Sequence, residues 1–140
     1  MASAAMPQFI GPWDTQIVAT AIHAGHDLRP DVAAAMLLSE QDRLREEDPF
    51  TDLIAAAVPD RVVTTRSRFE VDLNRPRREA VYRRPEDAWG LDLWRDGVLP
   101  EPLFRTGLAG AARERQELSL ARTASGGRAE AGHRRAHCAR

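Results

Sequence analysis

Short apolar runs between turn-forming residues mark the strands that the sequence predicts. Residues 16–22 (QIVATAI) form one such run, which is typical of a buried strand. Residues 61–65 (RVVTT) predict a second strand of the same kind. Residues 68–73 (RFEVDL) alternate strictly between polar and apolar positions, which predicts a strand with one buried face.

Helical spacing of apolar residues follows the first predicted strand. Asp31 can cap a helix that runs to about residue 47 and carries an apolar stripe. The pair Asp48-Pro49 ends this helix, because the residue before a proline disfavours the α region. A second, short helix is predicted over residues 53–58.

A long loop is predicted over residues 77–104, which are rich in proline, tryptophan and charge and allow one helical turn near 86–89. We expect Trp89 and Trp94 to fill the underside of this loop rather than to form a cage for a ligand.

The character of the chain changes after residue 104. Residues 105–140 contain eight arginines and nine alanines but no aromatic residue. A weakly amphipathic helix is predicted over 107–122, and the remainder has too little apolar surface to offset its ordering entropy, so we expect it to be disordered. The prediction is one domain over residues 1–104 and a tail over 105–140.

The overall composition is that of a soluble globular protein of 140 residues. A formal net charge of −1 gives no electrostatic reason to expect a nucleic acid or a membrane as partner. The apolar runs are too short to span a bilayer, and the first fifteen residues lack the features of a signal peptide, so a cytoplasmic protein is expected. The lone Cys138 excludes an intrachain disulfide framework and a cysteine-based zinc site.

The first cluster with chemical potential is His23-Ala-Gly-His26-Asp27, at the end of the first predicted strand. Open α/β sheets place ligands at such strand ends, and neutral imidazole is a common zinc ligand. Gly25 allows a sharp bend between the two histidines. The alternative is that His23 and His26 are ordinary surface or capping residues.

The second cluster is acidic and centres on Asp48, which Pro49 holds at the start of a loop. Asp48 could bind a metal ion directly or orient a metal-bound histidine. The alternative is a solvated acidic run at a helix C-terminus, where the helix dipole opposes negative charge.

The third cluster lies along residues 68–75. Arg68 and Asp72 are predicted on one strand face, with Asn74 and Arg75 at its end, which suits recognition of a carboxylate because guanidinium binds it in a planar fork. The alternative is an edge strand whose Arg and Asp side chains pair with neighbouring strands.

Taken in order, the three clusters resemble the N-formylglutamate amidohydrolase family. The most specific element is Ser-Arg-Phe-Glu-Val-Asp-Leu-Asn-Arg-Pro over residues 67–76, and the resemblance covers about residues 16–104. It implies an α/β protein with a three-layer α/β/α fold and a mostly parallel sheet, similar to the zinc carboxypeptidases. It also implies zinc-dependent hydrolysis of the formyl amide of N-formylglutamate, or of a similar N-acyl amino acid, in histidine breakdown.

The resemblance also implies roles for individual residues. The candidate metal ligands are His23, His26 and Asp48. The candidate substrate-binding residues grip the substrate carboxylates (Arg68, Arg75) or orient those arginines (Asp72, Asn74).

Members of this family are longer and supply a further histidine ligand from a downstream strand. His133 and His137 lie in a segment without a strand pattern, so the resemblance implies a fold that is incomplete at its C-terminus and a truncated, inactive chain unless the site is completed. The first alternative function is a non-catalytic remnant that binds carboxylates without a complete metal site. The second is an interaction or nucleic-acid-binding protein that uses the arginine-rich tail, which the balanced net charge disfavours.

Overall fold

The computed structural model describes residues 7–136, and for residues 121–136 it describes the backbone and the side chain of Thr123. His137 and Cys138, which the sequence analysis considered, lie outside the described residues. No helix among those described has both the length and the apolar character that crossing a membrane requires.

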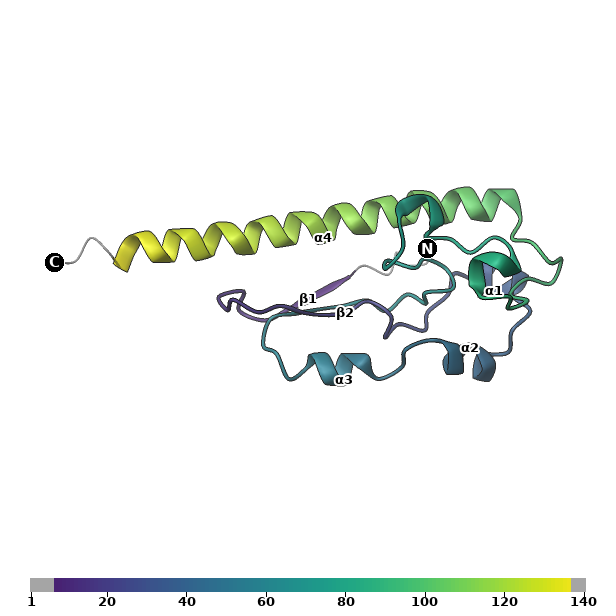
Figure 1. Cartoon of the computed structure of the whole chain (residues 1–140), viewed down its shortest axis with the longest axis horizontal. Helices are drawn as coiled ribbons and strands as arrows, with labels where there is room; N and C mark the ends of the chain where they lie inside the picture. The colour runs from purple at the N-terminus through teal and green to yellow at the C-terminus, as the bar shows by residue number, and fades with distance from the viewer. Residues whose placement is uncertain (1–6, 137–140) are drawn as a thin grey trace.

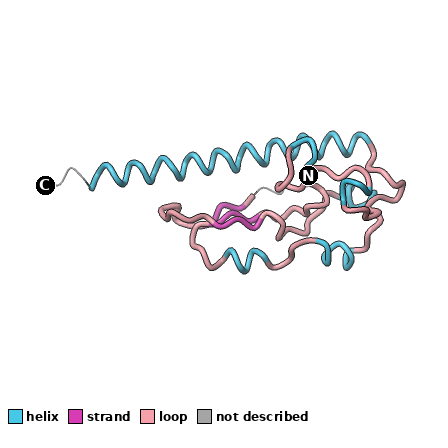
Figure 2. The backbone as a smooth tube through the Cα atoms, in the orientation of Figure 1, coloured by secondary structure: helices cyan, strands magenta, loops and turns pink. Residues whose placement is uncertain are grey.

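A small mixed sheet forms the centre of the molecule (Figure 2). Its strands are β1 (Gln8–Ile10), β2 (Ala19–Ala21) and β3 (Arg61–Val63), in the order β1-β3-β2. β1 runs antiparallel to β3, whereas β2 runs parallel to it with Thr20 opposite Val62. The strands predicted over 16–22 and 61–65 are confirmed in shorter form, and the class is α/β. The three-layer, mostly parallel arrangement stays a prediction.

The long helix predicted over 31–47 is wrong, because the chain forms two helices there. These are α1 (Pro30–Ala35) and α2 (Glu40–Glu46), separated by extended backbone at Met36. The main chain of residues 36–37 pairs with residues 93–94, and the amide of Leu37 donates to the carbonyl of Leu93 at 2.7 Å. Ser39 then caps α2 by accepting from the Asp42 amide at 3.1 Å.

The strand predicted over 68–73 is also wrong, since this segment is a turn. The amides of Glu70 and Val71 both donate to the carbonyl of Ser67, at 3.1 and 3.2 Å. The Ser67 hydroxyl accepts from the Phe69 amide at 3.1 Å and stabilises the same turn. Arg68 and Asp72 still lie on one side of the chain, four residues apart, as a turn of helical pitch allows.

Short helices also occur in the rest of the first hundred residues. α3 (Thr51–Ala55) confirms the predicted short helix with a small shift, and η1 (Arg77–Glu79) and η2 (Pro85–Ala88) are single 3-10 turns in the predicted loop. Trp94 is fully buried beneath this loop, as expected. The same expectation for Trp89 is wrong, because its side chain is 62% exposed.

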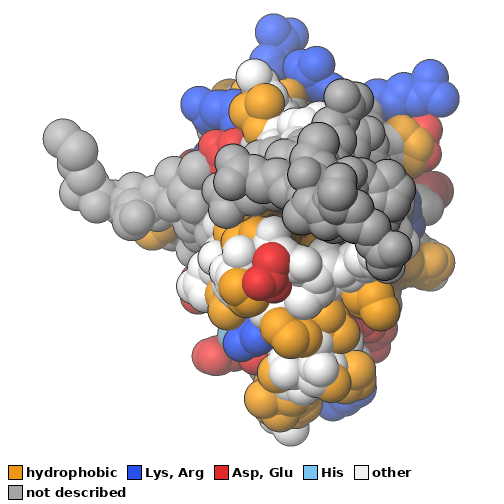
Figure 3. Space-filling model, turned by 90° about the vertical axis from the view of Figure 1, so that its left-hand side faces the viewer, with side chains coloured by type: hydrophobic (Ala, Val, Ile, Leu, Met, Phe, Trp, Pro, Cys, Tyr) orange, Lys and Arg blue, Asp and Glu red, His pale blue; other side chains and the backbone are white. Residues whose placement is uncertain are grey.

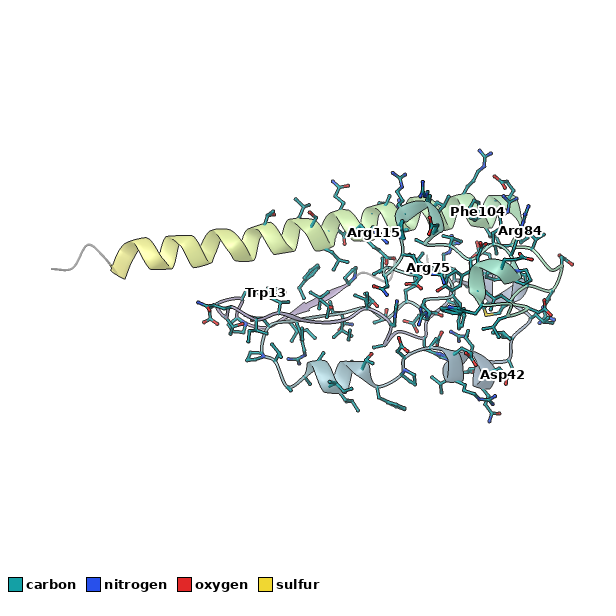
Figure 4. The ribbon with its side chains drawn as sticks, viewed as in Figure 1. Trp13, Asp42, Arg75, Arg84, Phe104 and Arg115 are labelled. Atoms are coloured by element: carbon teal, nitrogen blue, oxygen red, sulfur yellow. The ribbon has the colours of Figure 1, made fainter. Side chains whose placement is uncertain are left out.

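Helix α4 (Glu101–Ala136) crosses one side of the molecule and extends beyond the strands (Figure 1). It starts at Glu101, before the proposed boundary between residues 104 and 105, and reaches Ala136, within the segment that we expected to lack regular structure. The first turns pack on the body, where Ala111 is fully buried and Arg115 donates to the carbonyl of Leu73 at 3.1 Å (Figure 4). The division of the chain into two parts stays a prediction.

The main hydrophobic core lies between α1, the loop over residues 77–100 and the start of α4. Its largest fully buried side chains are Phe69, Tyr82, Leu93 and Trp94. Apolar side chains on α3 and just before β2 remain outside it: Ile17, Phe50, Leu53 and Ile54 are exposed. Figure 3 shows hydrophobic side chains gathered in the lower part of the molecule, at the height of α3.

Candidate functional site

The segment after β2 carries the first predicted cluster and runs beside the segment after β3. The amide of Asp27 donates to the carbonyl of Thr65 at 2.9 Å, and a parallel bridge joins Asp27 to Arg66. Gly25 permits this close approach, because a Cβ at that position would lie 2.2 Å from the carbonyl carbon of Thr65. The carboxyl ends of β2 and β3 thus bring residues 23–27 next to residues 66–72, as expected for a parallel pair.

His23 lies between two carboxylates. Its Nε2 is 2.8 Å from Oδ1 of Asp72, and its Nδ1 is 3.1 Å from Oδ2 of Asp48. His23 is 9% exposed and Asp72 is fully buried, whereas the Asp48 side chain is half exposed. The structure therefore brings one residue from each of the three predicted clusters to a single point.

Asp72 accepts hydrogen bonds on both of its oxygens. Oδ1 faces His23 and accepts from the Asn74 amide at 2.9 Å, while Oδ2 accepts from the Tyr82 hydroxyl and from Nη2 of Arg68 at 3.0 Å. Burial alone would raise the pKa of Asp72, but the hydrogen bonds from His23 and Tyr82 outweigh it and hold the pKa well below its usual range. The carboxylate is therefore ionised and serves as a fixed acceptor.

Tyr82 is a site residue that the sequence pattern did not indicate. Its ring is fully buried in the core, and its hydroxyl donates to Asp72. Burial and the hydrogen bond to the Asp72 carboxylate raise the pKa of Tyr82 to about 12. No spacing pattern in the sequence could have shown this contact, because the core around Tyr82 is assembled from distant segments.

The two predicted carboxylate-binding arginines converge on the same edge of Asp72. Nη2 of Arg68 lies 3.0 Å from Oδ2 of Asp72, and Nε of Arg75 lies 3.7 Å from the same oxygen. Arg68 also contacts Asp48 at 3.3 Å. Arg75 donates to the carbonyl of Asp87 at 2.7 Å. Both guanidiniums are thereby fixed next to His23.

Asn74 contributes to this arrangement through its main chain, since its amide donates to Asp72. The Asn74 residue is itself exposed. Its predicted role in orienting the arginines is therefore supported only indirectly, through the carboxylate that both arginines contact.

His26 belongs to a separate polar cluster. Nη2 of Arg43 lies 2.9 Å from Nε2 of His26, and because arginine has no acceptor atom, Nε2 accepts the hydrogen bond and Nδ1–H donates to Glu47. Glu47 is buried and also accepts from Arg43 at 2.9 Å and from the Ser67 hydroxyl. Both ring nitrogens of His26 are therefore engaged in hydrogen bonds, and its predicted role as a metal ligand stays a prediction.

Metal-binding capacity is limited within the part of the chain that the structure describes. Those residues contain no group of three or more His, Cys, Asp or Glu side chains that could hold a metal ion. The predicted ligands His23 and Asp48 do form a pair whose facing nitrogen and oxygen atoms are 3.1 Å apart. Two bonds of about 2 Å to one zinc ion would span that distance, so this pair fits as part of a zinc site.

The comparisons with known proteins agree with the order of the clusters. The sequence model of the family described as N-formylglutamate amidohydrolase matches residues 15–121. No curated protein and no solved structure gave a match. The family match covers every residue of the site described above and most of the chain. This protein therefore belongs to the N-formylglutamate amidohydrolase family.

Proposed function

We propose that this chain provides the metal-binding and carboxylate-binding half of an amidohydrolase site that cleaves the formyl amide of N-formylglutamate or of a similar N-acyl amino acid. The observation that carries the proposal is the position of His23, held between Asp72 and Asp48 beside Arg68 and Arg75. The parallel β2–β3 pair that ends at this site supports, as part of the same proposal, a three-layer fold like that of zinc carboxypeptidases.

His23 and Asp48 are the residues that would hold a zinc ion. When His23 is neutral and its Nε2–H donates to the buried Asp72 carboxylate, the Nδ1 lone pair faces an oxygen of Asp48. Two lone pairs at 3.1 Å repel one another unless a proton or a metal cation lies between them. A carboxylate behind a ligand histidine is also the usual means of fixing its tautomer. When bound, zinc would lower the pKa of its water to about 7 and polarise the formyl oxygen.

Arg68 and Arg75 would bind the carboxylates of the substrate. Arg68 is anchored by Asp72 and Asp48, and Arg75 by the Asp87 carbonyl, and each guanidinium could present its remaining Nη–H groups to a ligand. Because these anchors already hold the guanidiniums in position, little side-chain entropy is lost when a carboxylate binds. The buried Asp72 thus acts in both the metal-binding and the carboxylate-binding part of the site, because it orients His23 and holds Arg68.

The test is zinc affinity by calorimetry together with release of formate from N-formylglutamate. We expect Asp48→Asn and His23→Ala to weaken zinc binding by at least about tenfold, since each removes one ligand. Asp52→Asn changes a carboxylate of the same acidic run and should bind zinc as the wild type does. Equal zinc affinity in Asp48→Asn, Asp52→Asn and the wild type would contradict the proposed ligands.

The second candidate function is a carboxylate-binding module that works without metal. It is favoured by the two arginines, which are anchored independently of His23 through Asp87 and Asp72. Binding of glutamate in the presence of a chelator, without release of formate when zinc is added, would support this candidate. Formate release that depends on zinc and on His23 would exclude it.

A further inference from the structure

Trp89 stands out among the large aromatic side chains of the 77–104 segment because most of its side chain is exposed. Its side chain is 62% exposed, whereas Tyr82 and Trp94 are almost completely enclosed. Its backbone has a φ of 55°, in the left-handed region that a bulky residue rarely adopts. This conformation at the end of η2 directs the ring to the surface beside the arginines.

Two cations share the ring of Trp89. The guanidinium carbon of Arg68 lies 5.1 Å from the ring centroid, and that of Arg75 also lies 5.1 Å from it. Arg75 is in addition 4.6 Å from the ring of Tyr82, whose edge meets Trp89 at a centroid distance of 5.8 Å. The negative face of an aromatic ring attracts guanidinium, and indole does so most strongly. The ring therefore offsets part of the repulsion between the two arginines.

The same 3-10 turn fixes Arg75 from a second direction. The carbonyl of Asp87 in η2 accepts from Nη1 of Arg75 at 2.7 Å, and Trp89 follows two residues later. One short turn thus determines both the position of the Arg75 guanidinium and the plane against which it lies. Arg68 reaches the same ring from its own turn, where Asp72 holds its Nη2.

We propose that Trp89 is a positioning residue of the carboxylate site, which keeps the guanidiniums of Arg68 and Arg75 in the orientation that binds the carboxylate of a ligand. The inference rests on the proposed function. The Trp89 ring does not serve to fill the core, because most of its surface is exposed and the guanidiniums of Arg68 and Arg75 lie next to it. Removing the ring leaves both arginines in contact with Asp72 and Asp87 but allows their guanidinium planes to rotate.

The first part of the test measures L-glutamate binding by calorimetry to the whole chain. We expect Trp89→Leu to weaken binding by about tenfold, because leucine keeps apolar bulk but has no aromatic face, and Trp89→Phe to stay within about threefold of the wild type. Trp13→Leu is the matched control, since Trp13 also has a positive φ of 58° but packs at a tilt against the ring of Phe9. Equal affinity of Trp89→Leu and the wild type would overturn the proposal.

The second part measures the NMR signals of the arginine Nε–H groups in the protein without a ligand. In the wild type the indole should shift the signals of Arg68 and Arg75, and Trp89→Leu should lose this shift while Trp13→Leu keeps it. Unchanged arginine signals in Trp89→Leu would overturn the positioning role. If the wild type bound no glutamate, the proposed function would fail, and the NMR comparison would still decide whether Trp89 orients the arginines.

Discussion

The Nε2 atom of His23 lies 2.8 Å from Oδ1 of Asp72, although 49 residues separate the two along the chain. One residue follows a strand and the other closes a turn, and both are buried. A hydrogen bond between two buried groups from distant segments requires the sheet edge, the turn at residues 67–71 and the core beneath Tyr82 to form together. The site is therefore a product of folding as a unit, and its parts are sensitive to changes in the surrounding packing.

Tyr82 should keep its proton to unusually high pH. It is the single tyrosine of the chain, so the ultraviolet absorbance of tyrosinate reports on it alone. Burial and the Asp72 carboxylate raise its pKa to about 12, and we expect a titration midpoint near that value in the folded protein. Because the folded pKa is raised, stability should fall as the pH rises from about 10, the ordinary tyrosine value, to about 12. A midpoint at the ordinary value in folded protein would contradict the buried hydrogen bond.

Gly25→Ala should destabilise the protein by about 1–3 kcal/mol, as an overpacked site does. The added Cβ would lie 2.2 Å from the carbonyl carbon and 2.4 Å from the oxygen of Thr65, which are backbone atoms that cannot rotate away. Urea unfolding measures the change. Gly110→Ala is the control: no atom outside the helix lies within 4 Å, so alanine there should stabilise α4 by up to about 1 kcal/mol. Equal stability of the two variants would show that Gly25 is not closely packed.

Asp60 should make the start of the described chain sensitive to acid. The hydrogen bond from the Thr15 hydroxyl is the main cause that lowers the pKa of Asp60 below its ordinary 3.8, and the amides of Thr15 and Trp13 contribute, against the effect of burial. The stability that Asp60 contributes is present above pH 3.8 and is lost as the pH falls through its lower folded pKa. At neutral pH, we expect the amide protons of Trp13 and Thr15 to exchange with solvent faster in Asp60→Asn than in the wild type. Unchanged exchange would show that these hydrogen bonds do not hold the segment.

Glu114 should weaken the docking of α4 as the pH rises. Burial raises the pKa of Glu114 above its ordinary 4.5, Arg66 opposes this, and the charge of Glu70 adds to it. When the pKa of an acidic group is higher in the folded protein than in the unfolded chain, the folded protein loses stability as the pH rises from the unfolded pKa to the folded one. For Glu114 this loss begins at about pH 4.5. We expect the melting temperature of Glu114→Gln to rise relative to the wild type between pH 4 and neutrality. Glu79→Gln, which changes an exposed carboxylate, should show no such trend, and a parallel trend in both variants would refute the assignment.

The sequence was sufficient to predict those features that depend on residues close together in the chain. Apolar runs bounded by turn residues predicted β2 and β3, and the spacing of Arg68, Asp72 and Arg75 predicted that these charges act together. Their ion pairs survive the error in secondary structure, because residues four apart are neighbours in a turn of helical pitch as well as on one face of a strand. The family match over residues 15–121 covers these segments.

Tertiary structure decided what periodicity could not. The predicted helix over 31–47 breaks at Met36 because that backbone pairs with residues 93–94, and the alternation over 68–73 becomes a turn because Ser67 offers its carbonyl and hydroxyl to nearby amides. His23 and His26 look equivalent in the sequence but receive different partners: Arg43 and Glu47 engage both nitrogens of His26, while carboxylates face both nitrogens of His23. The sequence determined which residue types were available, and packing between distant segments decided which of them meet, because a buried polar or charged group is costly unless it finds a partner.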